Sequence, residues 1–243
     1  MKLIIDNGNC YTKVGIFDEC INLFYERIKN GDEHKIVDII KNYKIESTVI
    51  SSVIEENEHN IEELILPYAG KILKINHLTK LPFTNRYETP ETLGKDRVAA
   101  VAGAQLLFPD KNLLVIDAGT AITYDLLIEN EYIGGNIAPG LNMRLKALNY
   151  YTSKLPLVEI QPEKEFPGKN TKEAISSGVF FGMIFEIEGY INLCNKKFEK
   201  FLTIITGGDS NYFVEKIKNP IFAVPNLVLI GLNRILEYNE KIQ

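Results

Sequence analysis

Two short segments of this chain place an acid, a glycine and hydroxyl or amide side chains in the same order. In "KLIIDNGNCYTK" an apolar run ends at Asp6 and Gly8, and in "LLVIDAGTAITYD" a second apolar run ends at Asp117 and Gly119. A glycine lets backbone N–H groups approach phosphate oxygens, whereas an aspartate beside a phosphate requires a cation or a water between them. Asp-x-Gly alone is often only a turn, and it is the duplication that favours a phosphate-binding role.

Each copy predicts a β-hairpin with Asp-x-Gly at its bend, because strand-forming apolar residues stand on both sides of the motif. The rest of the chain alternates helical and strand patterns, which predict an α/β fold with a mixed or mostly parallel sheet. The loop "FPDKN" separates the two copies, so we expect two duplicated halves, residues 1–110 and 111–243. The expected helices cover residues 33–43, 60–70, 98–108, 171–194 and 227–239, and the expected further strands cover residues 47–53, 71–76 and 201–206.

The composition excludes several classes of protein. The chain has 243 residues, 45% of them apolar and 24% charged, which is ordinary for a globular protein. A net charge of −5 offers no basic surface for nucleic acid, and no apolar run approaches the ~20 residues that cross a bilayer. The N-terminus lacks the pattern of a signal peptide. We therefore expect a cytoplasmic protein without nucleic-acid or membrane partners. The cysteines are too scattered for a disulfide framework or a metal site: Cys10, Cys20 and Cys194.

The common motifs of other nucleotide-binding folds are missing. The Gly-Lys pairs in "LGKDR" and "PGKNT" lack the upstream glycine of a P-loop, and no G-x-G-x-x-G follows a strand. The duplicated Asp-x-Gly pattern instead resembles the actin-like ATPase and sugar-kinase superfamily. This resemblance implies two duplicated actin-like, or ribonuclease H-like, subdomains that hold ATP in a cleft between paired phosphate-binding hairpins.

A third acidic segment, "RYETPETLGKDRVAAVAGAQ", leads from a loop into an alanine-rich helix. Asp96 at the start of this helix has two interpretations. It could only cap the helix, since a helix N-terminus stabilises an anion. It could also act as a general base in a substrate loop, with Arg97 answering an anionic part of the substrate. The flanking Gly94 and Arg97 favour the second interpretation, because a cap does not require them.

The sequence as a whole resembles the type III pantothenate kinases along almost its whole length. The similar segments, in order, are "DNGNCYTK", "TLGKDR", "IDAGTAITYD", "GGNIAPGL" and "NTKEAISSGVFFG". The resemblance implies ATP-dependent phosphorylation of pantothenate, the first step of coenzyme A synthesis. It also implies a monovalent cation, K⁺ or NH₄⁺, together with Mg²⁺ for the nucleotide, and a homodimer.

The resemblance also implies roles for particular residues. Asp96 is the proton acceptor for the substrate hydroxyl, Asp117 is the ligand of the monovalent cation, and Thr120 contacts ATP. Thr171 contacts pantothenate from the neighbouring subunit. The implied ATP phosphate loop consists of Asp6, Asn7, Gly8, Asn9, Cys10, Tyr11, Thr12 and Lys13, and the other implied pantothenate contacts are Tyr87, Gly94, Lys95, Asp96 and Arg97.

Two positions of the first loop depart from the family pattern. Asn7 replaces a residue that is usually apolar, and Cys10 replaces a threonine or serine, which is the better hydrogen-bond donor. ATP contacts through the Cys10 side chain are therefore in question, whereas backbone contacts would remain.

The segment "NTKE" also allows two interpretations, since Asn170 and Glu173 have the spacing of a capping box around Thr171. A helix cap and a substrate contact are compatible there. Along the same helix Ala174, Gly178 and Gly182 form a small-residue face, which indicates either tight packing within one subunit or a dimer interface.

Two other functions fit the same fold. One is a non-catalytic binding protein or regulator, for example one linked to transcription, although the intact Asp6, Asp96 and Asp117 argue against it. The other is a different enzyme of the superfamily, such as a sugar kinase or a phosphatase. The short chain and the "GKDR" segment argue against a sugar kinase.

Overall fold

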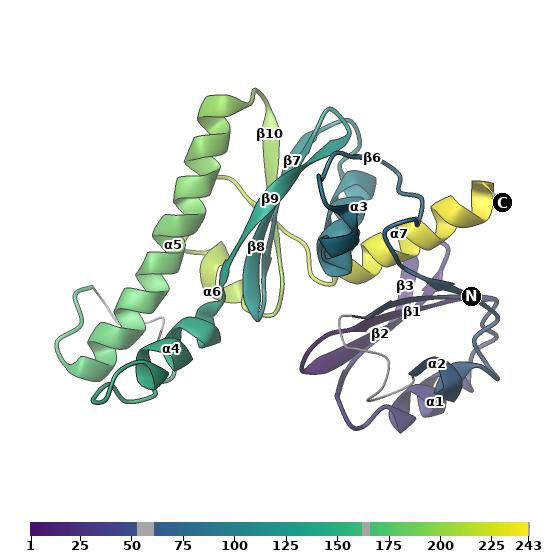
Figure 1. The fold of residues 1–243 in the computed structure, drawn as a ribbon, viewed down its shortest axis with the longest axis horizontal. Coiled ribbons are helices and arrows are strands. Elements are labelled where there is room, and N and C mark those ends of the chain that lie inside the picture. Colours follow the sequence, from purple (N-terminus) through teal and green to yellow (C-terminus); the bar gives the residue numbers. More distant parts are fainter. Residues whose placement is uncertain (53–60, 162–165, 243) are drawn as a thin grey trace. The chain divides into compact units, whose positions relative to one another are not determined.

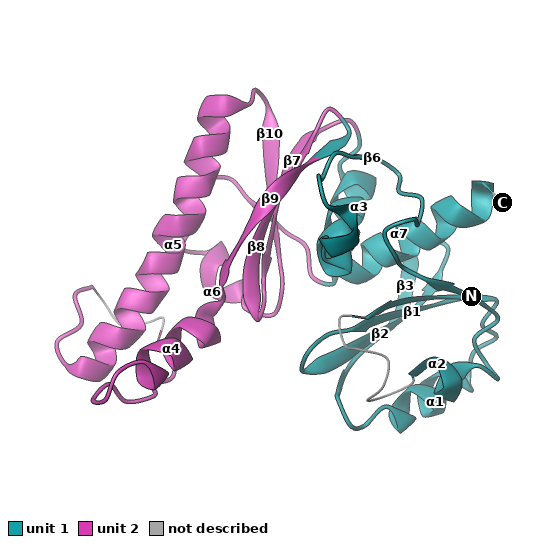
Figure 2. Ribbon diagram, viewed as in Figure 1, with its two compact units in different colours: residues 1–109, 130–132, 226–243 teal, residues 110–129, 133–225 magenta. Residues whose placement is uncertain are grey.

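The computed structural model describes residues 1–52, 61–161 and 166–242. The chain divides into two compact units (Figure 1, Figure 2). Unit 1 contains residues 1–109, 130–132 and 226–243, and unit 2 contains residues 110–129 and 133–225. The C-terminal helix, which we expected in the second half, thus belongs to unit 1, because it packs on a helix and a strand of that unit.

Unit 1 is built on a five-stranded sheet in the order β3-β2-β1-β4-β5. β1 pairs antiparallel with β2 and parallel with β4, so the predicted first hairpin is present. The strands are β1 (Lys2–Asn7), β2 (Tyr11–Asp18), β3 (Ile21–Lys29), β4 (Ser47–Ser52), β5 (Lys71–Lys74) and the short β6 (Thr84–Asn85). The helices are α1 (His34–Ile40), α2 (Ile61–Ile65), the 3-10 helix η1 (Pro90–Thr92), α3 (Lys95–Leu107) and α7 (Leu227–Ile242).

These elements match the expected helices and strands of the first half, with differences at their ends. Residues 53 and 60, where we expected a strand to end and a helix to begin, lie outside the described residues. α2 ends at Ile65, two residues before Pro67, because a proline disfavours helical backbone in the residue before it.

The two faces of the unit 1 sheet have different partners. Leu3 and Ile5 of β1 belong to a buried cluster that includes residues of α1 and α2. The alternate residues, Ile4 and Asp6, point to the other face, since successive side chains of a strand alternate. Gly15, the register partner of Ile4, lies against Leu229 of α7, which places α7 on that second face. Asp6 therefore lies on the face that α7 covers.

Helices α3 and α7 approach each other through glycines. A Cβ at Gly103 would lie 2.5 Å from the carbonyl oxygen of Leu227, and one at Gly231 would overlap the carbonyl oxygen of Ala99. The two backbones therefore meet without side chains between them. Because α7 also packs on β1, this crossing fixes where α3, and with it Asp96, begins.

Unit 2 repeats the topology of unit 1. Its strands follow the order β11-β10-β7-β8-β9. The first two residues of β9, Glu131 and Tyr132, belong to unit 1 and pair there with β6. β7 pairs antiparallel with β8 and parallel with β10, as β1 does with β2 and β4. The predicted duplication is thus confirmed. The elements are β7 (Asn112–Ala118), β8 (Ala121–Ile128), β9 (Glu131–Pro139), α4 (Leu141–Tyr150), α5 (Thr171–Lys197), β10 (Phe201–Thr206), α6 (Asn211–Val214) and β11 (Phe222–Ala223).

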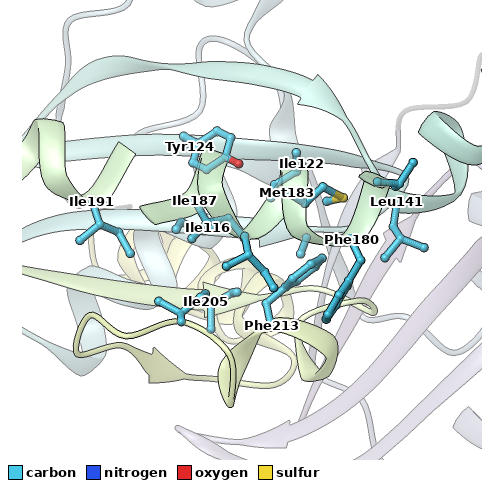
Figure 3. Packing of buried hydrophobic residues seen from close by; sticks show 14 of the residues in the cluster. Ile116, Ile122, Tyr124, Leu141, Phe180, Met183, Ile187, Ile191, Ile205 and Phe213 are labelled. Carbon is cyan, nitrogen blue, oxygen red and sulfur yellow. The ribbon is translucent and has the colours of Figure 1, made fainter. Parts of the chain in front are cut away.

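The core of unit 2 lies between its sheet and α5 (Figure 3). Ile116, Ile122 and Tyr124 of the β7–β8 hairpin pack with side chains of α5, α4 and α6. We did not expect α4, because only its first residue belongs to the quoted motif "GGNIAPGL" and the segment after that motif was not interpreted. The labelled α5 residues of this core are Phe180, Met183, Ile187 and Ile191.

By length and composition alone α5 could cross a membrane, contrary to our expectation that no segment approaches such a length. Half of its most apolar window is buried inside the protein, however, and its buried side chains belong to the unit 2 core. The long apolar pattern of α5 is explained by packing on the sheet.

Candidate nucleotide and substrate site

The first hairpin presents a buried acid paired with a lysine. Asp6 is only 5% exposed, and Lys13, its register partner on β2, donates from Nζ to Asp6 Oδ2 at 3.2 Å. Burial raises the pKa of Asp6, and the charge of Lys13 and its hydrogen bond oppose that rise. The negative charge of Asp96 also acts on Asp6, so the two acids we singled out are electrostatic neighbours.

The side chains of Asn7 and Thr12 lie on the opposite face of the sheet from Asp6. Both are buried, and Thr12 Oγ1 donates to Asn7 Oδ1 at 3.0 Å. Asn7 Nδ2 in turn donates to Ser52 Oγ, and Asn30 Nδ2 donates to the carbonyl oxygen of Gly8 at 2.9 Å. These hydrogen bonds stabilise the hairpin turn from the face of the sheet opposite Asp6. The buried polar side chain of Asn7 is thus accommodated by hydrogen bonds.

The residues at the tip of the hairpin are the accessible ones. Gly8 N–H donates to the carbonyl oxygen of Tyr11 at 3.1 Å and closes the turn. Asn9, Cys10 and Tyr11 are exposed. The accessible groups of the predicted phosphate loop are therefore its tip and Lys13, rather than all eight residues.

Asp96 lies in the first turn of α3, but it does not act as the N-cap. Gly94 is the N-cap residue and makes no side-chain cap. Asp96 Oδ1 accepts from the N–H of Arg97 at 2.8 Å, and a Cβ at Gly94 would lie 2.6 Å from that oxygen. Glycine at position 94 thus leaves room for the carboxylate.

The neighbours of Asp96 tie α3 to the sheet and to the preceding loop. Lys95 Nζ donates to the carbonyl oxygen of Ser52 at 3.1 Å, which joins the start of α3 to the end of β4. Arg97 is buried, and its guanidinium lies 5.7 Å from the ring centroid of Tyr87. The structure therefore brings together the predicted substrate residues 87 and 94–97 near the Asp6 end of the sheet.

Asp117 occupies the same place in unit 2 as Asp6 in unit 1. Its register partners are Thr123 on β8 and Thr206 on β10, so a hydroxyl stands at the position that Lys13 occupies in the first copy. Thr123 Oγ1 is buried and has no hydrogen-bond partner among the described residues. The second copy thus offers oxygen atoms where the first has an ammonium group.

Two glycines far away in sequence enclose the turn after Asp117. A Cβ at Gly207, whose φ is +96°, would overlap Asp117 Oδ1 and the carbonyl oxygen of Ala118. A Cβ at Gly140 would overlap the carbonyl oxygens of Gly119 and Thr120, while its N–H donates to Thr120 at 3.2 Å. Thr120 itself is exposed, as a ligand contact requires.

The structure separates the two interpretations of "NTKE". Asn170 is the N-cap of α5 and accepts from the N–H of Glu173 at 3.1 Å, and Glu173 Oε2 accepts from the N–H of Lys169 at 3.0 Å. The cap is therefore made by Asn170 and Glu173. Thr171 is exposed beside it, and its side chain is not used by the cap.

Sequence reasoning missed several residues of this site. Asn30, Ser52, Thr123, Gly140 and Gly207 contact or adjoin the predicted motifs only through strand register or chain folding. The duplication could have predicted one of them, since "IDAGTAIT" places Thr123 near the position that Lys13 has in the first copy.

Two cavities of about 370 and 380 Å³ within the described residues lie away from these motifs, beside α4 and between β3 and α1.

The duplicated sheet, with an acid at the end of the first strand of each copy, defines a protein of the actin-like ATPase and sugar-kinase fold. Two solved structures share this fold. A candidate Baf family transcriptional activator from Campylobacter jejuni has a TM-score of 0.63 at 22% identity, covering 98% of this chain and 99% of the other. A candidate 2-dehydro-3-deoxygalactonokinase from Sinorhizobium meliloti has a TM-score of 0.62 at 14% identity, with the same coverage.

Comparison with related sequences identifies the family within this fold class. The pattern of the type III pantothenate kinase family matches residues 2–193. A protein from Phocaeicola vulgatus named type III pantothenate kinase is 44% identical over 248 residues, covering 100% of both chains. The chain therefore belongs to the type III pantothenate kinase family.

Proposed function

We propose that this protein transfers the γ-phosphoryl group of ATP to the primary hydroxyl of pantothenate and forms 4′-phosphopantothenate, the first step of coenzyme A biosynthesis. The observation that supports this most strongly is the family match, which extends over the whole chain of a relative named for that activity. The acids at positions 6, 96 and 117 agree with it, because each stands at the end of a strand or the start of a helix.

In the proposed reaction the pantothenate hydroxyl oxygen attacks the γ-phosphorus. The new P–O bond forms as the bond to the β-phosphate oxygen breaks, ADP leaves, and the hydroxyl proton passes to Asp96. In such transfers the protein mainly positions groups and offsets charge. Asp96 suits the acceptor role because the residue is partly exposed. The Arg97 N–H holds Oδ1 and leaves Oδ2 for the substrate hydroxyl.

The chain offers oxygen ligands that fit the proposed cations. Asp117 and the buried hydroxyl of Thr123 would hold K⁺ or NH₄⁺, because hard cations prefer oxygen ligands. Asp6 would hold hydrated Mg²⁺, which usually binds one or two carboxylates together with substrate phosphates. No group of three or more His, Cys, Asp or Glu gathers among the described residues, which is consistent with that mode. The cations would offset the charge of the triphosphate.

The direct test is ATP-dependent phosphorylation of pantothenate by the purified protein in K⁺, NH₄⁺ and Na⁺ buffers. We expect turnover in K⁺ or NH₄⁺ and little in Na⁺, and we expect Asp117→Asn to remove this cation dependence together with most of the activity. Folded protein that binds ATP but phosphorylates no pantothenate in any buffer would favour a binding protein or regulator. Turnover of a sugar in place of pantothenate would favour a different kinase.

The pH dependence of activity should report the Asp6–Lys13 pair. If Asp6 must be ionised, activity falls as the pH drops through its pKa, which burial raises and Lys13 lowers. Lys13→Met removes the lowering effect, so the acidic limb of the kcat/KM profile should move to higher pH. Lys13→Arg keeps the charge and should leave the limb near its wild-type position. An acidic limb that is unchanged in Lys13→Met would show that Asp6 does not control it.

We further propose a cytoplasmic homodimer that is formed through α5 and brings Thr171 to the partner's pantothenate site. The small-residue face is not packed within the described chain, because a Cβ at Gly178 or Gly182 would meet no atom within 4 Å. Phe185 on the next turn is 63% exposed. These observations favour an interface between subunits over packing within one subunit as the reason for the glycines.

Gly182→Trp tests this interface. A large side chain there should weaken the dimer by about 5- to 150-fold, since overpacking an interface costs on the order of 1–3 kcal/mol. Sedimentation over a range of protein concentrations measures the change, and Lys197→Trp at the far end of the helix is the control. A wild-type protein that sediments as a monomer at every concentration would contradict the proposal.

A further inference from the structure

Four polar residues form one row across the unit 1 sheet. Ser51 on β4 pairs in register with Asp6 on β1, Asp6 pairs with Lys13 on β2, and Lys13 pairs with Arg27 on β3. Register partners on neighbouring strands point to the same face. Arg27 therefore points to the same face as Asp6 and Lys13, although it lies on β3, the strand after the β1–β2 hairpin.

Arg27 is held in place by the phosphate hairpin itself. Its guanidinium carbon lies 3.6 Å from the ring centroid of Tyr11, which is two residues before Lys13 and so on the same face of the sheet. Stacking on an aromatic ring orders the long side chain while its N–H groups stay available. Both residues are exposed, so a ligand can reach them.

The charge of Arg27 is not neutralised within the protein. Among the residues that the structure describes, none forms an ion pair with Arg27. Lys13, in contrast, is already paired with Asp6. An ordered guanidinium without an acid partner, stacked on the strand that follows the exposed hairpin tip, is suited to bind a phosphate through paired hydrogen bonds.

We propose that Arg27, held against Tyr11, binds the phosphates that remain on ADP. The positions of Asp6 and Arg27 in this row indicate that Arg27 binds the α- and β-phosphates rather than the transferred γ-phosphate. Asp96 acts electrostatically on Asp6, and its neighbour Lys95 donates to Ser52 at the end of β4. Arg27 lies on the other side of Asp6, two strands away, about 10 Å at the usual spacing. The acceptor and the γ-phosphate belong at the Asp6 end, so Arg27 faces the leaving group. This inference rests on the proposed use of ATP.

The test compares nucleotide binding by Arg27→Gln and the wild-type protein, using ADP, a non-hydrolysable ATP analogue and adenosine in titration calorimetry. We expect Arg27→Gln to weaken ADP and the ATP analogue by similar factors, about tenfold or more, as for hydrogen bonds to charged groups. Adenosine affinity and the KM for pantothenate should not change. The loss should shrink at high salt.

Variants of Tyr11 separate ordering of Arg27 from its charge. Tyr11→Ala should lose part of the ADP affinity, whereas Tyr11→Phe, which keeps the ring, should lose less. Lys71→Gln, which removes an exposed cation at the start of β5, is the control for net charge.

ADP affinity in Arg27→Gln within twofold of the wild type would overturn the inference, as would a loss confined to the ATP analogue. If ADP binding depends on Arg27 but pantothenate is not phosphorylated, the proposed substrate fails and the role of Arg27 stands. Wild-type protein that binds neither nucleotide would contradict both.

Discussion

Asp96→Asn should lower turnover of pantothenate by about 10²–10⁴-fold, the usual contribution of a positioned general base. The amide has the shape of the carboxylate, and its oxygen can still accept from the Arg97 N–H, a contact of 2.8 Å in the wild type. The start of α3 should therefore stay intact. ATP binding should be retained, because the Asp6–Lys13 pair and the hairpin tip are unchanged.

The measurement is steady-state turnover together with the affinity for a non-hydrolysable ATP analogue. Glu91→Gln is a matched control, since it makes the same acid-to-amide change at an exposed residue of η1 in the preceding loop. Turnover of Asp96→Asn within a few fold of the wild type would assign Asp96 to the structure of the helix start rather than to catalysis. Loss of ATP binding would assign it to nucleotide binding.

Gly231→Ala should destabilise unit 1 by about 3 kcal/mol, the upper part of the usual range for overpacking a core. The added methyl group would overlap the carbonyl oxygen of Ala99, and Gly103 N lies only 2.8 Å from the same point. Backbone atoms cannot turn aside as a flexible side chain can, so α3 and α7 must separate. A small domain is stable by only about 5–15 kcal/mol, so this loss is large.

Urea denaturation followed by circular dichroism measures this effect, with Gly189→Ala as the control. Gly189 also lies in a helix, but a Cβ there would meet nothing within 4 Å, so alanine should stabilise α5 by up to about 1 kcal/mol. Equal stability of Gly231→Ala and the wild type would mean that the α3–α7 crossing can widen without cost.

Because α3 carries Asp96, we also expect Gly231→Ala to lose activity at temperatures well below its unfolding.

The sequence by itself determined the features that depend on near neighbours. Asp6 and Asp117 stand at strand ends because a short apolar run stops at an acid and a glycine, which is a local pattern. The long helix that begins near Thr171, the capping residues Asn170 and Glu173, and the duplication itself could be predicted for the same reason. The motif order was also sufficient to indicate the family.

Only the tertiary structure decided which way the motif residues face and what lies against them. Asn7 and Thr12 were expected in the phosphate loop, but strand alternation turns their side chains away from Asp6. Arg27 meets Lys13 through strand register, and Gly207 meets Asp117 through a parallel strand from much later in the chain. α7 joined unit 1 for the same physical reason, since contacts between distant segments depend on register and close packing, which a local pattern does not encode.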